Sequence, residues 1–195
     1  MKVCELCVLD FTAVNLLANL IKSIEKKNHE VVTICDVNEH EKEIHQLKLK
    51  VIDFKIQRSF NVINHIKKIY LLRKIFKKEK FDVIHVHTPI GSIIGRIAAL
   101  LSGNSQVYYT VHGFYFHEKM PLIKRSIFFA IEYILSYFTK KIFFQSKEDF
   151  IFAKKTLKNS KLFYIGNGID LDFFTKDNFD EQSKKIFWEK YYVNK

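Results

Sequence analysis

The run FDVIHVHTPIGSIIGRIAALLSGNSQVYYTVHGFYFH, residues 81–117, decides the fold. It holds two short apolar stretches rich in β-branched residues, 81–87 and 105–111, which are typical of strands. Between them lies a helical stretch with Pro89 at its start and Gly103 at its end. Strands that are apolar at nearly every position are covered on both faces, as in parallel sheets. The run therefore predicts a strand–helix–strand unit whose two strands are parallel.

Small residues give the helix of this unit an unusual face. Gly91, Gly95 and Ala99 recur every fourth residue, so one side of the helix is bare and can lie close to a sheet. Thr88 stands directly before the helix, and its hydroxyl group is expected to cap the first turn.

The same alternation of short strands and longer helices continues along the rest of the chain. We expect further strands at residues 2–9, 30–35, 51–56, 141–145 and 161–165, and helices at 12–27, 39–47, 61–80, 121–138 and 146–157. Asn28 is expected to end the first helix in the left-handed conformation, and Ser146 with Asp149 to cap the last one. The fold class is therefore α/β, with three α/β/α layers around a mostly parallel sheet of about seven strands.

Length and composition fit one domain of ordinary size. The chain has 195 residues, of which 48% are hydrophobic. We expect no signal peptide, because the first residues lead directly into a strand, and no membrane-spanning helix, because no run of 18 apolar residues exists. Cys4 and Cys7 are three residues apart in one strand and therefore face opposite sides. Together with Cys35 they indicate buried, reduced thiols in a cytoplasmic protein.

The net charge of +11 does not by itself indicate a nucleic-acid partner. Of the 32 basic residues only Arg58, Arg73, Arg96 and Arg125 are arginine, the residue whose forked donors suit bases and phosphates. The lysines are spread along helices. We therefore expect no nucleic acid, and favour an anionic membrane surface as the partner of this charge.

Ligands of open parallel sheets bind at the carboxyl ends of the strands. This rule selects three segments, residues 9–13, 87–91 and 112–117. The first contains no glycine, which argues against a dinucleotide-binding turn. A phosphate could still meet the backbone N–H groups where the helix begins near Thr12, and a simple capped turn fits equally well.

Histidines stand out in the other two segments. His85 and His87 share one face of a strand, a spacing that can bind metal, but no acidic or cysteine residue shares that face of the strand to complete a site. We therefore predict no metal site, and interpret one histidine as a bonded core residue and His87 as the cleft residue. His112 ends a buried strand and precedes Gly113, which permits a sharp turn.

The aromatic residues after Gly113 complete the third segment. Phe114, Tyr115 and Phe116 could form walls for a sugar ring or a lipid-linked acceptor. The imidazole of His112 can accept or donate a proton near neutral pH, which makes it the strongest catalytic candidate. A purely structural histidine is the alternative.

These residues resemble the N-terminal domain of glycosyltransferase family 4, the retaining GT-B enzymes of capsule, lipopolysaccharide and exopolysaccharide assembly. The family pattern is a strand ending in HxHxP, a helix with spaced Gly and Ala, and a strand ending in HG[FY]. Three other segments fit this pattern: VLDFTAVNLLANLIKSIEKKNHEVVTIC (8–35), IEYILSYFTKKIFFQSKEDF (131–150) and IGNGIDLDFF (165–174). Asn28 stands where the family usually has glycine. The resemblance covers about residues 1–175.

The resemblance implies the Rossmann-like N-terminal half of a GT-B fold, with no metal and no cofactor. Residues 1–170 would be the acceptor-side domain, and 171–195 the hinge and the start of a donor domain. His112 would be the catalytic cleft histidine, near the transferred sugar and the acceptor hydroxyl. The remaining expected site residues are His87, Thr88, Gly113, Phe114 and Tyr115 for the acceptor, and Asp10, Phe11 and Thr12 for the donor phosphates.

Family members continue for about another domain after this point, whereas only residues 175–195 follow here. The ExxxxxxxE donor motif is absent. We therefore expect a nucleotide-sugar to bind only with a C-terminal donor domain, while the chain itself binds a lipid-linked or glycan acceptor. A non-catalytic module that docks acceptor or membrane is one alternative. Half of a GT-B epimerase is another, which HTP followed by HGF disfavours.

The basic and apolar helices suggest a location at the inner face of the cell membrane. Residues 126–138 are apolar apart from Glu132, and basic side chains flank them on both sides. Lysines also line the outer face of the helix at 61–80. An apolar surface with basic edges can rest on anionic lipid, so we expect a cytoplasmic, peripheral membrane protein.

Overall fold

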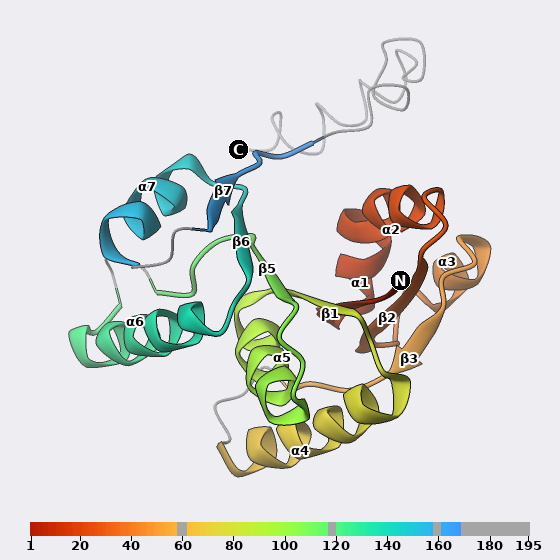
Figure 1. Cartoon of the computed structure of the whole chain (residues 1–195), viewed down its shortest axis with the longest axis horizontal. Helices are drawn as coiled ribbons and strands as arrows, with labels where there is room; N and C mark the ends of the chain where they lie inside the picture. The colour runs from red at the N-terminus through yellow and green to blue at the C-terminus, as the bar shows by residue number, and fades with distance from the viewer. Residues whose placement is uncertain (58–61, 117–119, 158–160, 169–195) are drawn as a thin grey trace, which may run out of the picture.

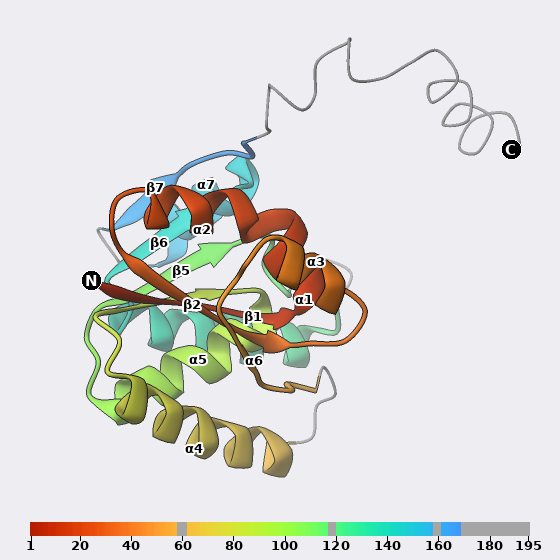
Figure 2. The same ribbon diagram turned by 90° about the vertical axis from the view of Figure 1, so that its right-hand side faces the viewer.

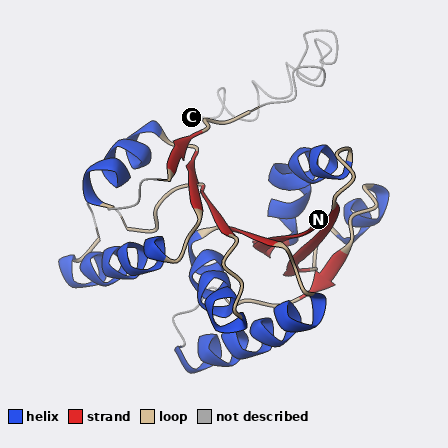
Figure 3. Cartoon of the chain, viewed as in Figure 1, coloured by secondary structure: helices blue, strands red, loops and turns tan. Residues whose placement is uncertain are grey.

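The computed structural model describes residues 1–57, 62–116, 120–157 and 161–168. These residues form one sheet with strand order β3-β2-β1-β4-β5-β6-β7, in which every neighbouring pair is parallel. Figure 3 shows the strands in the middle of the molecule and helices around them. The predicted α/β, Rossmann-like fold with a parallel seven-stranded sheet is confirmed.

The described strands are β1 (Lys2–Leu9), β2 (Glu30–Asp36), β3 (Val51–Asp53), β4 (Val83–His87), β5 (Val107–Val111), β6 (Lys141–Phe144) and β7 (Leu162–Tyr164). The described helices are α1 (Asp10–Thr12), α2 (Ala18–Glu25), α3 (Glu41–Gln46), α4 (Val62–Glu79), α5 (Pro89–Ser102), α6 (Leu122–Tyr137) and α7 (Lys147–Thr156), with a π-helical turn at Ala13–Leu17. The elements occur in the predicted order, and several strands are shorter than expected, β3 most of all.

Two layers of helices enclose the sheet. Figures 1 and 2 show α4, α5 and α6 on one face and α1, α2 and α3 on the other. Buried side chains form one apolar cluster on each face, and the two clusters divide successive residues of β1 between them. Cys4 belongs to the first cluster and Cys7 to the second, as the strand parity predicted. All three cysteines are buried free thiols.

The bare face of α5 packs directly on the sheet. A Cβ atom at Gly95 would lie 2.4 Å from Leu6 Cδ2 and 2.7 Å from Val86 Cγ1, and one at Gly91 would lie 3.1 Å from Val8 Cγ2. These contacts confirm the close approach predicted from the spacing of small residues. The helix ends at Gly103 with φ 85°, a left-handed conformation that glycine adopts without strain.

Three local predictions about helix ends can be compared with the structure. Asn28 has φ 60°, and Ser146 accepts a hydrogen bond from the Asp149 amide at 3.2 Å, so both predictions are confirmed. Thr88 precedes α5 but makes no side-chain cap; its hydroxyl group donates to the His87 carbonyl at 2.6 Å. The predicted cap is therefore wrong, because Thr88 has φ 63° and its hydroxyl group turns back to the strand.

A buried ion pair joins α5 to α6. Arg96 Nη2 lies 2.7 Å from Glu132 Oε2, and the two residues are 1% and 6% exposed. The Arg96 guanidinium also lies over the Tyr109 ring, 4.4 Å from its centroid. Glu132, the single charge within residues 126–138, therefore points into the core, and apolar residues of α6 are left at the surface.

Candidate active site

A cavity of about 400 Å³ opens at the carboxyl ends of the central strands. All three segments selected from the sequence contribute to its wall, in agreement with the rule for open parallel sheets. The lining residues are Val8, Leu9, Thr12, Thr88, Pro89, Ile90 and Tyr115. His112 is not among them, although Tyr115 of the same loop is.

The first segment is helical rather than a loop. The helix begins at Asp10, two residues before the predicted start, and the Asp10 side chain is 4% exposed. Its carboxylate accepts hydrogen bonds from the amides of Phe11, Asn38 and His40 at 2.8 to 2.9 Å. Burial raises the pKa of Asp10, and these hydrogen bonds more than offset it, so the net pKa lies below the ordinary value.

These contacts revise the expectation for the donor-phosphate segment. Asp10 holds the chain after β2 in place, and a second anion beside its buried carboxylate would be repelled. Phe11 is half exposed, and Thr12 lines the cavity. Thr12 is therefore the member of this segment that is placed to meet a ligand.

The second segment contains a strained residue. Thr88 has φ 63°, which is rare for a β-branched side chain and costs on the order of 1–3 kcal/mol. Its side chain lines the cavity between β4 and α5. Backbone strain of this kind clusters at binding and catalytic sites, which agrees with the predicted role of Thr88.

His87 does not line the cleft as predicted. Its side chain is 1% exposed and lies on the sheet face beside β1. Nε2 of His87 lies 2.7 Å from Glu5 Oε2, and Nδ1 lies 3.1 Å from Nε2 of His112. The alternation of strand side chains turns His87 toward the sheet face, so it does not line the cavity and contacts the loop after β5 through His112.

Glu5 is the main site residue that the sequence interpretation missed. It is fully buried in β1, where its carboxylate contacts His87 and also His85 Nδ1, at 3.1 Å from Oε2. His85 Nε2 in turn lies 2.8 Å from the Thr110 hydroxyl. A lone acidic residue within an apolar strand was the available signal, because a buried carboxylate requires partners.

Burial and hydrogen bonding set the charges in this cluster. Burial raises the pKa of Glu5, but the electrostatic interaction with His85 and the hydrogen bonds from His85 and His87 outweigh it and bring the pKa to about 2. Burial lowers the pKa of His87 to about 4, with a further lowering from His85 and only partial compensation by Glu5. Near neutral pH the cluster therefore contains an ionised carboxylate and a neutral His87.

The cluster can be compared with the requirements of a metal site. Glu5, His85 and His87 each offer one ligand atom, and these atoms lie within 4.8 Å of one another. Glu5 lies on β1, which is next to the strand of the histidines in the sheet. Its distance from them in the sequence therefore does not exclude such a site. The 2.7 Å between Oε2 and Nε2 of His87 is a charge-assisted hydrogen-bond length.

His112 lies at the open end of this network. It is partly buried, and burial lowers its pKa while a hydrogen bond with the Gln145 side chain partly restores it. Gly113 has φ 149°, and the Phe114 amide donates to Asp149 Oδ2 at 3.3 Å. Phe114 stacks on Phe116 at 4.7 Å between ring centroids. The loop after His112 is therefore anchored to α7 rather than free.

The parallel sheet, its strand order and the cavity at its carboxyl edge define a Rossmann-like domain of the GT-B type. A family model described as glycosyl transferase 4-like matches residues 5–146. The chain belongs to this glycosyltransferase family.

Known proteins similar to this chain agree with that assignment. An Escherichia coli UDP-Gal:alpha-D-GlcNAc-diphosphoundecaprenol alpha-1,3-galactosyltransferase is 34% identical over 119 residues, which is 60% of this chain and 31% of the relative. The structure of Anabaena HepE in complex with UDP and glucose matches with a TM-score of 0.71 at 14% identity, covering 99% of this chain and 50% of HepE.

UDP-GlcNAc 2-epimerase from Neisseria meningitidis, solved with UDP-GlcNAc, matches with a TM-score of 0.67 at 14% identity. That match covers all of this chain and 54% of the epimerase. At such low identity the structural matches show the fold alone. The chain spans about half the length of these solved structures, and the E. coli match covers under a third of that relative.

Proposed function

We propose that residues 1–170 are the acceptor-side domain of a glycosyltransferase. A complete enzyme would transfer a sugar from a nucleotide-sugar to a lipid-linked glycan in cell-surface polysaccharide assembly. One observation carries this proposal. Residues from all three strand-end segments line a single cavity, and this cavity lies next to the loop that starts at His112. The lipid-linked acceptor is suggested by the name of the E. coli relative.

The roles of the site residues follow from their positions. Thr12, Thr88 and Tyr115 line the cavity and are placed to contact the ligand. Gly113 gives the loop its turn, and Phe114 supports the loop through Asp149. The predicted hinge at residues 171–195 lies outside the described residues, and the donor-binding half is proposed to belong to a further domain.

The chain itself permits a direct test of whether the acceptor and the nucleotide-sugar bind to separate domains. By isothermal titration it is expected to bind a sugar-diphosphopolyprenol acceptor but not UDP-galactose, and to transfer no sugar alone. Transfer is expected once a donor domain of the family is joined to it. Binding of the nucleotide-sugar without the acceptor would contradict the proposal and favour an epimerase-like role. Acceptor binding that never leads to transfer would favour the non-catalytic docking module.

We also propose that the surface formed by the first two turns of α6 rests on the cytoplasmic face of an anionic membrane. No helix among the described residues is long and apolar enough to cross a bilayer. Leu122, Ile123 and Ile127 are 75%, 77% and 54% exposed, and Lys124 is exposed between them. An apolar surface with adjacent cations can enter the lipid interface.

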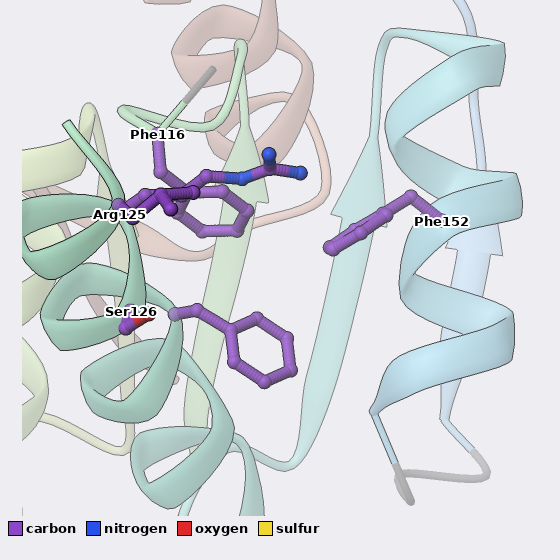
Figure 4. A pocket seen from close by; sticks show the side chains of 6 residues that line it. Phe116, Arg125, Ser126 and Phe152 are labelled. Atoms are coloured by element: carbon purple, nitrogen blue, oxygen red, sulfur yellow. The ribbon is translucent and has the colours of Figure 1, made fainter. Parts of the chain in front are cut away.

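A second cavity lies behind this surface, between α6 and α7. It has a volume of about 290 Å³ and is lined by Phe116, Leu122, Arg125, Ser126, Phe129 and Phe152. Figure 4 shows Arg125 reaching from α6 past Phe116 toward Phe152 on α7. An aromatic cavity with one guanidinium suits the junction of an anionic headgroup and an apolar chain.

Liposome co-sedimentation tests the membrane proposal. The chain is expected to sediment with phosphatidylglycerol vesicles, less so as salt rises, and not with phosphatidylcholine vesicles. Replacing Leu122 and Ile123 with serine is expected to reduce binding at least tenfold. Leu16→Ser, which alters a residue that is 54% exposed on the helical segment after β1, is the matched control. Equal binding to both lipids, or none, would remove the proposal.

A further inference from the structure

Three side chains form a continuous line from the core to the loop of the candidate site. The Glu5 carboxylate lies 2.7 Å from Nε2 of His87, and Nδ1 of His87 lies 3.1 Å from Nε2 of His112. Glu5 and His87 are 0% and 1% exposed, whereas His112 is only partly buried. The line therefore connects a fully buried anion with the imidazole proposed to act in the cleft.

The protons in this line can be placed by counting donors and acceptors. An ionised carboxylate only accepts hydrogen bonds, so Nε2 of His87 must carry a proton. A neutral imidazole has one ring proton, which leaves Nδ1 of His87 as an acceptor. Since Nδ1 faces Nε2 of His112, that nitrogen must be the donor. His112 then holds its proton on Nε2, and its Nδ1 carries the lone pair.

The neighbouring groups fit the same placement of protons. His85 can donate from Nδ1 to Glu5 and accept from the Thr110 hydroxyl at Nε2. The side chain of Gln145 meets His112 from the end of β6. Its amide can turn either its NH₂ or its oxygen to the ring, so it is compatible with this state.

Burial lowers the pKa of His112 below the ordinary value, so its ring is neutral near neutral pH. With a neutral His112, one other arrangement satisfies the distances. If His87 were a cation, both its nitrogens would donate, Nε2 of His112 would accept, and the proton of His112 would move to Nδ1. Burial lowers the pKa of His87 well below its ordinary value, which disfavours that cation near neutral pH. The two arrangements differ in the tautomer of His112, which is a measurable quantity.

We propose that Glu5, acting through His87, is a positioning residue that fixes His112 as the neutral Nε2–H tautomer, with Nδ1 as its only basic atom. In the transfer reaction His112 then serves as a neutral hydrogen-bond acceptor for a sugar hydroxyl and carries no positive charge. This consequence rests on the proposed function, whereas the tautomer itself does not.

The tautomer is tested by long-range ¹H–¹⁵N NMR of the chain labelled with [¹⁵N]histidine at pH 7. Ring nitrogen shifts are expected to show His112 as a single Nε2–H species, which becomes a cation only below the ordinary histidine pKa. A cationic His112 at pH 7, or an Nδ1–H species, would overturn the proposal. No sugar substrate enters the measurement, so its outcome is independent of the transfer assay.

Glu5→Gln tests the role of the carboxylate. A carboxamide can turn either its oxygen or its NH₂ group to Nε2 of His87, so unlike the carboxylate it does not require a proton on that nitrogen. The signal of His112 is expected to change from one tautomer to a mixture of both. Glu41→Gln removes an exposed carboxylate from α3 and is expected to leave the spectrum of His112 unchanged. A single Nε2–H species that persists in Glu5→Gln would exclude Glu5 as the positioning residue.

Discussion

Replacing Glu132 with alanine is expected to lower the free energy of unfolding by about 3–5 kcal/mol, a large part of a domain's stability. The change leaves the Arg96 guanidinium buried with its charge unpaired, because Arg96 is 1% exposed and its Nη2 contacts Glu132 at 2.7 Å. Its remaining contacts are the Ser92 carbonyl at 3.2 Å, the Ser92 hydroxyl at 3.3 Å and the Tyr109 ring, none of which carries a compensating charge. Urea denaturation followed by circular dichroism measures the loss.

Two control variants distinguish the cost of leaving a buried charge unpaired from the cost of losing one ion-pair contact. The double variant Arg96→Met/Glu132→Leu removes both charges and is expected to recover most of the stability. Glu30→Ala breaks an exposed pair with Lys50, at 3.2 Å, and is expected to cost at most about 1 kcal/mol. A Glu132→Ala variant no less stable than Glu30→Ala would show that the buried pair contributes little.

His112→Ala is expected to lower transfer by a complete enzyme, with its donor domain, by about 100-fold or more. His112 is proposed to hydrogen-bond at the reacting centre, and losing such a group typically has an effect of this size. The measurement is kcat/KM for transfer to a lipid-linked acceptor. Stability should change less than activity, because His112 is at the partly exposed end of the Glu5 network.

The matched control for this variant is His45→Ala. His45 lies on α3 with 79% of its side chain exposed, and its removal is expected to leave transfer unchanged. Unfolding curves of both variants show whether the fold is kept. Full activity of His112→Ala would mean that the histidine only completes the hydrogen-bond network.

Much of the fold was predictable because its signals are local. Runs of β-branched residues and helical periodicity gave the order of the strands and helices. The spacing of Gly91, Gly95 and Ala99 predicted the close packing of α5, and strand parity predicted the opposite faces of Cys4 and Cys7. The grouping of three strand-end segments followed from one rule about parallel sheets.

The features that could not be predicted depend on contacts between residues that lie far apart in the sequence. Glu5 is 80 residues from His85, and Arg96 is 36 from Glu132, so no local pattern joins them. His87 was expected in the cleft because it ends a strand, but its parity turns it toward Glu5. Asp10 accepts hydrogen bonds from amides of residues beyond β2, which no local pattern predicts, and its place beside the donor phosphates stays a prediction.

The sequence distance between Glu5 and its partners also has a consequence for synthesis. A chain leaves the ribosome from its N-terminus, so the carboxylate of β1 emerges well before the imidazoles of β4 that will enclose it. A nascent chain that ends within α4 cannot bury Glu5 with its partners, and it keeps that carboxylate in water. We expect arrested chains of that length to stay protease-sensitive, and those extended beyond Gln145 to become resistant. β1, an inner strand of the sheet, is thus made first and completed late.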